Sequence, residues 1–250
     1  MFSIGITTFK YRFQPYFIPL VNKIKEIDPA IEIVVAANGE HRNAFDENYR
    51  KNFLKFISEK QNVIPVMFPC FRGLAKLWNN IVIFSSSDFI FLLNDDVAIT
   101  DKNILQVIGS LLVKNDYHSF KINHCWSHMV LNKSEVDELG YFDERLLGIG
   151  EEDRDFEWRY GNYYHREFQN FDIPGILNFT DMTHQPSNIK IGLRNKYSFF
   201  NTHFIYHEKY QVNETAGEQI GMWPEKMLPL LENSPQYPYE KFFKMRQGEL

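Results

Sequence analysis

A short apolar run that ends in two adjacent carboxylates constrains this chain more than any other feature. Residues 89–93 are all apolar, which is typical of a strand buried on both faces of a parallel sheet. Asn94, Asp95 and Asp96 follow directly. Adjacent acids repel each other, and carboxylate oxygens suit a hard cation such as Mg2+ or Mn2+. Because open α/β sheets bind ligands at such strand ends, the run predicts a cation site. The alternative is that Asp95 and Asp96 simply form a solvated turn and cap the next helix.

Strand-like and helix-like segments alternate through about the first hundred residues. Apolar strands are expected at residues 2–7, 31–37, 63–68 and 89–93, and amphipathic helices at 15–27, 43–60 and 73–84. Such alternation predicts a parallel sheet joined by right-handed crossovers, with helices on its faces. The expected fold class is therefore α/β.

The rest of the chain is expected to add shorter elements and a helical end. We expect helices at 102–114 and 152–160, short strands at 119–123 and 128–133, and one more strand at 171–179. A capping box at 134–137 opens a brief helix that Gly140 ends. From about residue 187 aromatic residues are frequent, which favours helices packed on the main domain, or else a surface for an acceptor, a subunit or a membrane. We divide the chain into a main domain over 1–186, with halves 1–100 and 101–186, and a helical, aromatic-rich extension over 187–250.

Composition narrows the class of partner. The net charge is -5 and no basic block is present, which disfavours nucleic acid as a partner. Cys70 and Cys125 form neither a disulfide framework nor a Cys-x-x-Cys pair, which fits a reducing compartment. The start of the chain lacks the pattern of a signal peptide, and no apolar run reaches the ~18 residues of a membrane span. We expect a cytoplasmic protein without a transmembrane segment, which leaves room for peripheral membrane contact.

Five segments, in order, carry a resemblance to a known family. They are residues 6–9 (ITTF), 34–39 (VVAANG), 72–79 (RGLAKLWN), 92–97 (LLNDDV), and 139–144 (LGYFDE) followed by 152–155 (EDRD). Together they resemble the motifs of GT-A-fold glycosyltransferases of the family 2 type, over about residues 1–185. The LLNxD pattern resembles rhamnosyltransferase-type members in particular. The resemblance implies a GT-A, Rossmann-like sheet that binds a nucleotide-sugar.

The resemblance also implies which residues bind the donor. They are Thr7, Thr8, Asn38, Arg72, Asn94 and Asp95. Thr8 and Asn38 would border the base, and Arg72 would reach the diphosphate, unless it is an ordinary surface arginine. Asn38 and Asn94 stand where the family often has Asp, so base recognition and metal affinity are expected to differ from the family's.

Metal binding and catalysis are assigned by the same resemblance. Asp96 is the expected ligand of Mn2+ or Mg2+, which lowers the barrier to loss of the diphosphate. His184 completes the metal site or is a plain surface or core histidine. Asp153, with Glu152 beside it, is the expected general base, the alternative being that these acids only cap a helix.

The expected activity is inverting, metal-dependent transfer of a hexose or deoxyhexose from a UDP- or dTDP-sugar to a hydroxyl. Polysaccharide, lipid-linked oligosaccharide and glycoprotein glycan are all acceptors of the right chemistry. Three alternatives stay open: a retaining transferase of the same fold, a non-catalytic nucleotide-sugar-binding module, and a sugar-nucleotide pyrophosphorylase. The last is disfavoured because residues 7–10 contain no glycine, whereas such an enzyme needs a glycine-rich basic loop after its first strand.

Overall fold

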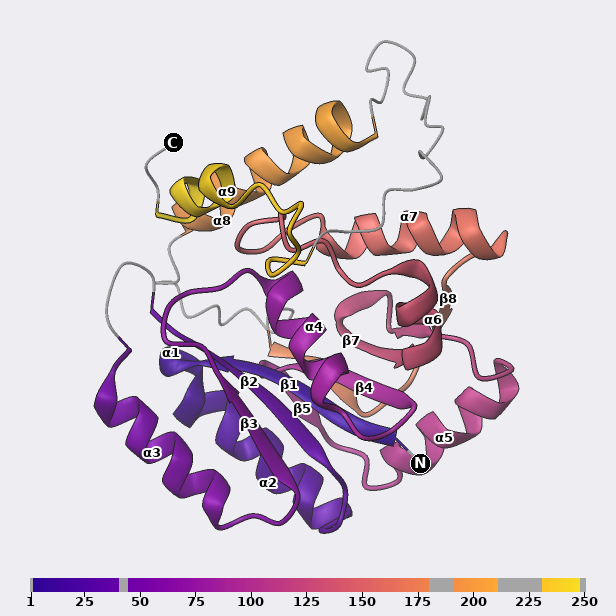
Figure 1. Cartoon of the computed structure of the whole chain (residues 1–250). Coiled ribbons are helices and arrows are strands. Elements are labelled where there is room, and N and C mark those ends of the chain that lie inside the picture. Colours follow the sequence, from indigo (N-terminus) through magenta and orange to yellow (C-terminus); the bar gives the residue numbers. More distant parts are fainter. Residues whose placement is uncertain (1, 41–44, 180–190, 211–230, 248–250) are drawn as a thin grey trace. The chain divides into compact units, whose positions relative to one another are not determined.

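A computed structural model of the chain describes residues 2–40, 45–179, 191–210 and 231–247 (Figure 1). The chain divides into two compact units. The first comprises Met1–Phe71, Leu77–Glu138 and Phe168–Pro186, and the second comprises Arg72–Lys76, Leu139–Glu167 and Ser187–Leu250. Residues 139–167 therefore group with the C-terminal residues.

The first unit is built on a sheet whose strands, within the described residues, run in the order β3-β2-β1-β4-β7-β6-β8. Its parallel strands are β1 (Phe2–Phe9), β2 (Ile33–Asn38), β3 (Val63–Met67) and β4 (Phe89–Asn94). The next strands are β7 (Cys125–Asn132), antiparallel to β4, β6 (Phe120–Ile122), antiparallel to β7, and β8 (Gln169–Phe171), parallel to β6. The four expected parallel strands and the α/β class are confirmed.

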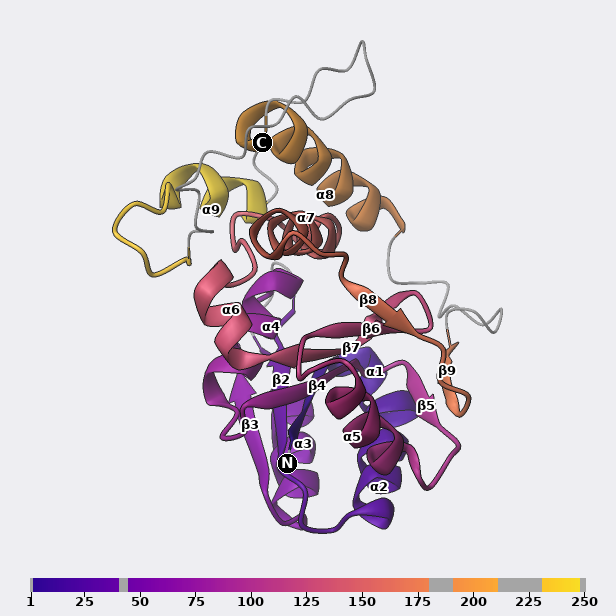
Figure 2. The same cartoon turned by 90° about the vertical axis from the view of Figure 1, so that its right-hand side faces the viewer.

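Helices cover both faces of this sheet. The chain steps from β1 to β2 to β3 in one direction and then returns across the sheet to β4. Right-handed crossovers therefore put α2 (Ile18–Ile27) and α3 (Glu47–Ser58) on one face and α4 (Leu74–Phe84) on the other, as Figure 2 shows for α2 and α4. The approach of α4 to β1 is close, since a Cβ added to Gly5 would lie 2.2 Å from Cγ2 of Ile81.

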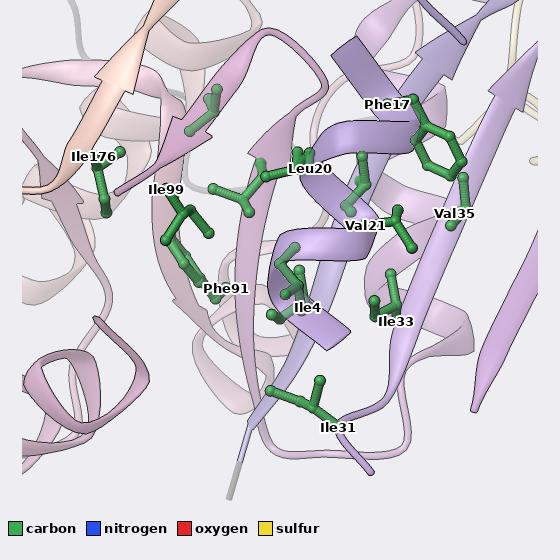
Figure 3. Packing of buried hydrophobic residues seen from close by; sticks show 14 of the residues in the cluster. Ile4, Phe17, Leu20, Val21, Ile31, Ile33, Val35, Phe91, Ile99 and Ile176 are labelled. Atoms are coloured by element: carbon green, nitrogen blue, oxygen red, sulfur yellow. The ribbon is translucent and has the colours of Figure 1, made fainter. Parts of the chain in front are cut away.

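Alternate strand residues fill the main core on the α2 and α3 side. Figure 3 shows Ile4, Ile33 and Val35 from the strands packed beside Phe17 and Val21. Helix α5 (Ile104–Lys114) adds its buried face to the same core. The intervening residues of β2 and β4 are buried as well, which is why these strands read as unbroken apolar runs.

Three expectations about the elements are wrong. The first helix begins at Lys10, not at residue 15, and passes through α1 (Lys10–Arg12) and a π-helical turn, η1 (Phe13–Phe17), before α2. Pro15 lies inside that turn; it has no N–H and its ring crowds the preceding turn, and a π-helical turn is one way a helix absorbs such a residue. The other two concern residues 171–179 and the start of the helix at 134–137.

Residues 171–179 form two strands in different sheets. β8 ends at Phe171, and β9 (Ile176–Asn178) pairs instead with β5 (Val97–Ile99), a strand that the sequence does not predict. Pro174 and Gly175, the latter with φ +90°, form the bend that separates β8 from β9.

The brief helix α6 (Lys133–Leu139) begins one residue before the expected cap. Oδ1 of Asn132 accepts hydrogen bonds from both the backbone N–H and the hydroxyl of Ser134, so Asn132 is the capping residue. Gly140 follows with φ +80°, which confirms the expected C-terminal glycine.

The second unit is helical in its described parts and rich in aromatic contacts. Its elements are α7 (Glu152–Tyr164), α8 (Ile191–His203), a π-helical turn η3 (Phe204–Lys209) and α9 (Tyr239–Gln247). Phe142 stacks on Phe156 with ring centroids 4.6 Å apart, and Phe242 contacts Phe200 and Phe204. Among the described residues of both units, no helix has the length and apolar character needed to cross a membrane.

Candidate active site

The carboxyl ends of β1 and β4 meet at the point where the strand order reverses. Thr7 on β1 lies opposite Asn94 on β4, and the Thr7 hydroxyl donates a 3.0 Å hydrogen bond to Oδ1 of Asn94. Asn38, the last residue of β2, pairs with Phe9 on the other side of β1. Thr7, Thr8 and Asn38 are all at least nine-tenths buried. The structure therefore gathers four of the expected donor-binding residues at the edge where open α/β sheets bind ligands.

Asp95 and Asp96 follow at the same edge, between β4 and β5, and both are buried. Their side chains are 2% and 7% exposed. The alternative of a solvated turn is therefore wrong. Burial raises the pKa of Asp95 to about 7 against the opposing charge of Arg12, and the Asp96 carboxylate adds to the rise.

A guanidinium that the sequence analysis missed lies between the two acids. Nη1 of Arg12 is 3.0 Å from Oδ1 of Asp95 and 2.7 Å from Oδ2 of Asp96. The available signal was weak: a basic residue shortly after the first strand, on a segment where no helix was expected. Only the fold, which brings the end of β1 beside the end of β4, makes Arg12 a partner of the acids.

The remaining oxygens of the acidic pair fit a cation. Oδ2 of Asp95 and Oδ1 of Asp96 are buried and accept no hydrogen bond of good geometry from any described residue, although the Thr8 hydroxyl is near enough to the Asp95 carboxylate to oppose the rise in the pKa of Asp95. Buried acceptors of this kind call for a ligand or a water, and carboxylate oxygens suit Mg2+ or Mn2+. Within the described ranges, however, no three His, Cys, Asp or Glu side chains converge to hold a metal ion. A cation here would depend on these two carboxylates and on oxygens that its ligand brings.

A second polar cluster lies next to β4 on the antiparallel side. His128 pairs with Leu93 across the sheet, and its Nδ1 lies 2.9 Å from the Ser127 hydroxyl oxygen. Asn178 donates to the same oxygen at 2.7 Å. His124, four residues before His128, lies in the β6–β7 hairpin turn, exposed and 3.6 Å from Asp172. The spacing of the two histidines thus falls on a strand and a turn and does not form a helical metal pair.

The expected catalytic acids open helix α7 in the second unit. Glu152 is 3% exposed and accepts a 2.6 Å hydrogen bond from the Gly150 N–H. Burial raises the pKa of Glu152 to about 8, with the Asp153 carboxylate adding to the effect. Asp153 is only half-buried, and burial raises the pKa of Asp153 as well. Two neighbouring carboxyls with different exposure can hold different protonation states near neutral pH.

The loop that leads into α7 is fixed by helix α8. Asn201, fully buried, accepts from the Leu147 N–H at 2.8 Å and donates to the carbonyls of Leu147 at 2.8 Å and Gly150 at 2.7 Å. Gly148 has φ +60°, and an added Cβ there would lie 2.4 Å from the Tyr197 ring, so only glycine fits. The sequence held no sign of the role of Asn201, because this contact joins residues that lie 54 positions apart.

Asp155, close in sequence to Asp153, belongs instead to a buried ionic network. Its carboxylate lies 3.1 Å from Nε of Arg159 and 2.6 Å from Nζ of Lys209, and it also accepts from the Tyr210 hydroxyl. Lys209 is also 2.7 Å from Asp143. Asp155 is therefore a structural residue that ties η3 to α7.

The expected site residues fall into the two units. Thr7, Thr8, Asn38 and the run 94–96 lie together in the first unit, while Glu152 and Asp153 lie in the second. Arg72 also belongs to the second unit, where its Nη1 is 3.1 Å from Glu232. His184 lies outside the described residues.

Several solved structures have a fold similar to that of this chain. No protein-family model and no curated protein matches the chain. Residues 1–349 of S. aureus TarS, in complex with UDP, align with a TM-score of 0.51 at 14% identity, covering 69% of this chain and 60% of that one. Another S. aureus TarS structure gives a TM-score of 0.54 at 15% identity, covering 70% and 36% of the two chains.

A third similar structure is the mannosyltransferase PcManGT from Pyrobaculum calidifontis, in complex with GDP-Man and Mn2+. It aligns with a TM-score of 0.56 at 12% identity, covering 69% of this chain and 54% of that one. The chain thus spans about a third to three fifths of the length of the structures it matches. At these identities the likeness establishes the fold: an α/β sheet flanked by helices, of the GT-A glycosyltransferase type.

Proposed function

We propose that this protein is a glycosyltransferase that uses a nucleotide-sugar donor. The observation that carries the proposal is the buried pair Asp95–Asp96, which follows Asn94 at the strand end beside Thr7. Similar folds have been solved with UDP in TarS and with GDP-Man and Mn2+ in PcManGT, which supports a nucleotide-sugar as the ligand class.

In this proposal each residue at the carboxyl ends of β1, β2 and β4 has a role in binding the donor. Thr8 and Asn38 border the base of a UDP- or dTDP-sugar, Thr7 and Asn94 hold the ribose side, and Asp95 lies near the phosphates. Asp96, with Asp95, would hold Mn2+ or Mg2+, which when bound offsets the charge that grows on the departing diphosphate. Arg72 and His184 remain proposed contacts of the diphosphate and the metal.

Asp153 is the proposed base of an inverting transfer. Its half-buried carboxylate takes the proton of the acceptor hydroxyl as the hydroxyl oxygen bonds to the anomeric carbon. The bond from that carbon to the diphosphate oxygen breaks at the same time. A pKa raised by burial makes the Asp153 carboxylate a better proton acceptor than an ordinary aspartate. Glu152, with its pKa raised to about 8, stays protonated near neutral pH and is a positioning residue.

Residues 92–96 resemble the LLNxD motif of rhamnosyltransferase-type enzymes, so the proposed donor sugar is a hexose or deoxyhexose. The proposed acceptor is a hydroxyl of a polysaccharide or another glycan, lipid-linked or not. Both described cysteines are free thiols, which fits action in the cytoplasm.

The test is release of nucleoside diphosphate from UDP-, dTDP- and GDP-sugars, with the anomeric configuration of the product read by NMR. We expect one donor to turn over with inversion, and Asp153→Asn to lose ~10²–10⁴-fold in rate while still binding that donor. Asp172→Asn, the same change at an exposed site, should match the wild type.

Three results would contradict the proposal. Retention of configuration would assign the reaction to the retaining alternative and remove the role of Asp153. Full activity in Asp153→Asn would place the base elsewhere. Donor binding without any release of diphosphate would favour the non-catalytic binding module.

A further inference from the structure

Arg12 already supplies one positive charge to the acidic pair in the protein itself. One guanidinium nitrogen lies within 3.0 Å of both carboxylates, and the Arg12 side chain is only 18% exposed. Its guanidinium carbon lies 5.3 Å from the centre of the Phe9 ring, which packs the charged group against the end of β1. Arg12 is thus held from two sides, by the acids and by an aromatic face.

A divalent cation on the same carboxylates would meet this guanidinium at short range. The two like charges would then share two acids within a few ångströms, in a partly desolvated place where repulsion is strong. Either the cation is excluded or the guanidinium gives up at least one carboxylate. Nη1 contacts Oδ1 of Asp95 and Oδ2 of Asp96. A cation could therefore bind the other two oxygens, Oδ2 of Asp95 and Oδ1 of Asp96.

We propose that Arg12 is an internal counterion that competes with the divalent cation for Asp95 and Asp96, and so weakens metal binding by the protein. This inference rests on the proposed metal role of the acidic pair. A displaced guanidinium needs another anion, and the diphosphate of a nucleotide supplies one with matching geometry. Metal and nucleotide therefore bind cooperatively, and Arg12 is the residue that couples them.

The test measures metal affinity directly, without turnover. Free Mn2+ is followed by electron paramagnetic resonance as it is titrated into the full chain, alone and with UDP. In the absence of nucleotide, Arg12→Gln should bind Mn2+ about tenfold or more tightly than the wild type. UDP should strengthen Mn2+ binding in the wild type and do so much less in the variant. Arg50→Gln, on the exposed ion pair with Glu47, is the matched control and should leave Mn2+ affinity unchanged.

A conservative variant guards against loss of folding. Arg12→Lys keeps the charge, but the lysine side chain is shorter and its ammonium is a compact point charge that reaches the two acids less closely than Nη1 of Arg12 does, so Mn2+ should bind about threefold more tightly than in the wild type. If circular dichroism shows Arg12→Gln unfolded, Arg12→Lys decides. Mn2+ affinity that is equal to the wild type or weaker in the folded variants overturns the proposal, as does a lack of Mn2+ binding in all of them.

These outcomes are separate from those of the transferase test. Tighter Mn2+ binding in Arg12→Gln together with no diphosphate release from any donor would support the competition and contradict the transferase. Diphosphate release with no effect of Arg12 on Mn2+ affinity would do the reverse.

Discussion

Replacing Lys209 tests whether the buried ionic network holds the second unit together. Lys209 is fully buried, and its ammonium lies 2.7 Å from Asp143 and 2.6 Å from Asp155, both of them fully buried. Lys209→Met keeps most of the side-chain volume and removes the charge. Breaking a buried ion pair by removing one partner costs about 3–5 kcal/mol.

The remaining partners set the magnitude within that range. Asp143 keeps its contact with Arg145 at 2.5 Å, and Asp155 keeps Arg159 at 3.1 Å. Neither carboxylate is left without a cation, so we expect the lower end, about 3 kcal/mol of unfolding free energy. For a chain of this size that corresponds to a fall of about 6–12 °C in Tm.

Urea unfolding at pH 7, followed by circular dichroism, measures the loss. The matched control is Lys241→Met, because Nζ of Lys241 lies 2.9 Å from Glu208 but is 46% exposed. An exposed pair contributes about 0–1 kcal/mol. If Lys209→Met costs no more than Lys241→Met, the network does not stabilise the unit and the reasoning from burial is wrong.

Two further predictions concern the segment around α7. Because the pKa of Glu152 is raised to about 8, the folded protein binds more protons than the unfolded chain from about pH 4.5 to 8, so stability falls as the pH rises through that window. Glu152→Gln should remove that fall and gain up to about 5 kcal/mol over the wild type above pH 8, as read by urea unfolding at several pH values. Parallel pH profiles of the two proteins would contradict this prediction. Asn201→Ala leaves three backbone groups of the 147–150 loop unpaired and should lower the free energy of unfolding by about 3 kcal/mol. The control Asn48→Ala, at an exposed helix position, should lower it little. Equal losses in the two variants would show that the loop does not depend on Asn201.

The parallel half of the sheet could be predicted because local pattern and global fold agree there. Strands β2 and β4 are buried on both faces, so each reads as a continuous apolar run ended by polar residues. The same logic placed Thr7, Asn38 and Asn94 at the carboxyl edge, since strand ends follow directly from the runs.

Other features of the fold and the site could not be predicted, because they depend on contacts between residues far apart in the sequence. Arg12 meets Asp95 across 83 residues of chain, and the pairing arises only because β1 and β4 are neighbours in the sheet. Strand β5 is three residues long and exists because β9 pairs with it. Asp155 lies in the motif at 152–155 next to the expected base, and only the buried Lys209 beside it shows its structural role.

The proposed function requires that a nucleotide bind at the carboxyl edge of β1 and β4. Isothermal titration of UDP, dTDP and GDP, each with Mn2+, tests it on the wild type, on Asp96→Asn, and on Asp116→Asn as an exposed control with the same chemical change. We expect at least one nucleotide to bind, Asp96→Asn to weaken nucleotide binding by about tenfold or more, and Asp116→Asn to leave nucleotide binding unchanged. Equal binding by Asp96→Asn and the wild type, or no binding of any nucleotide, would contradict it.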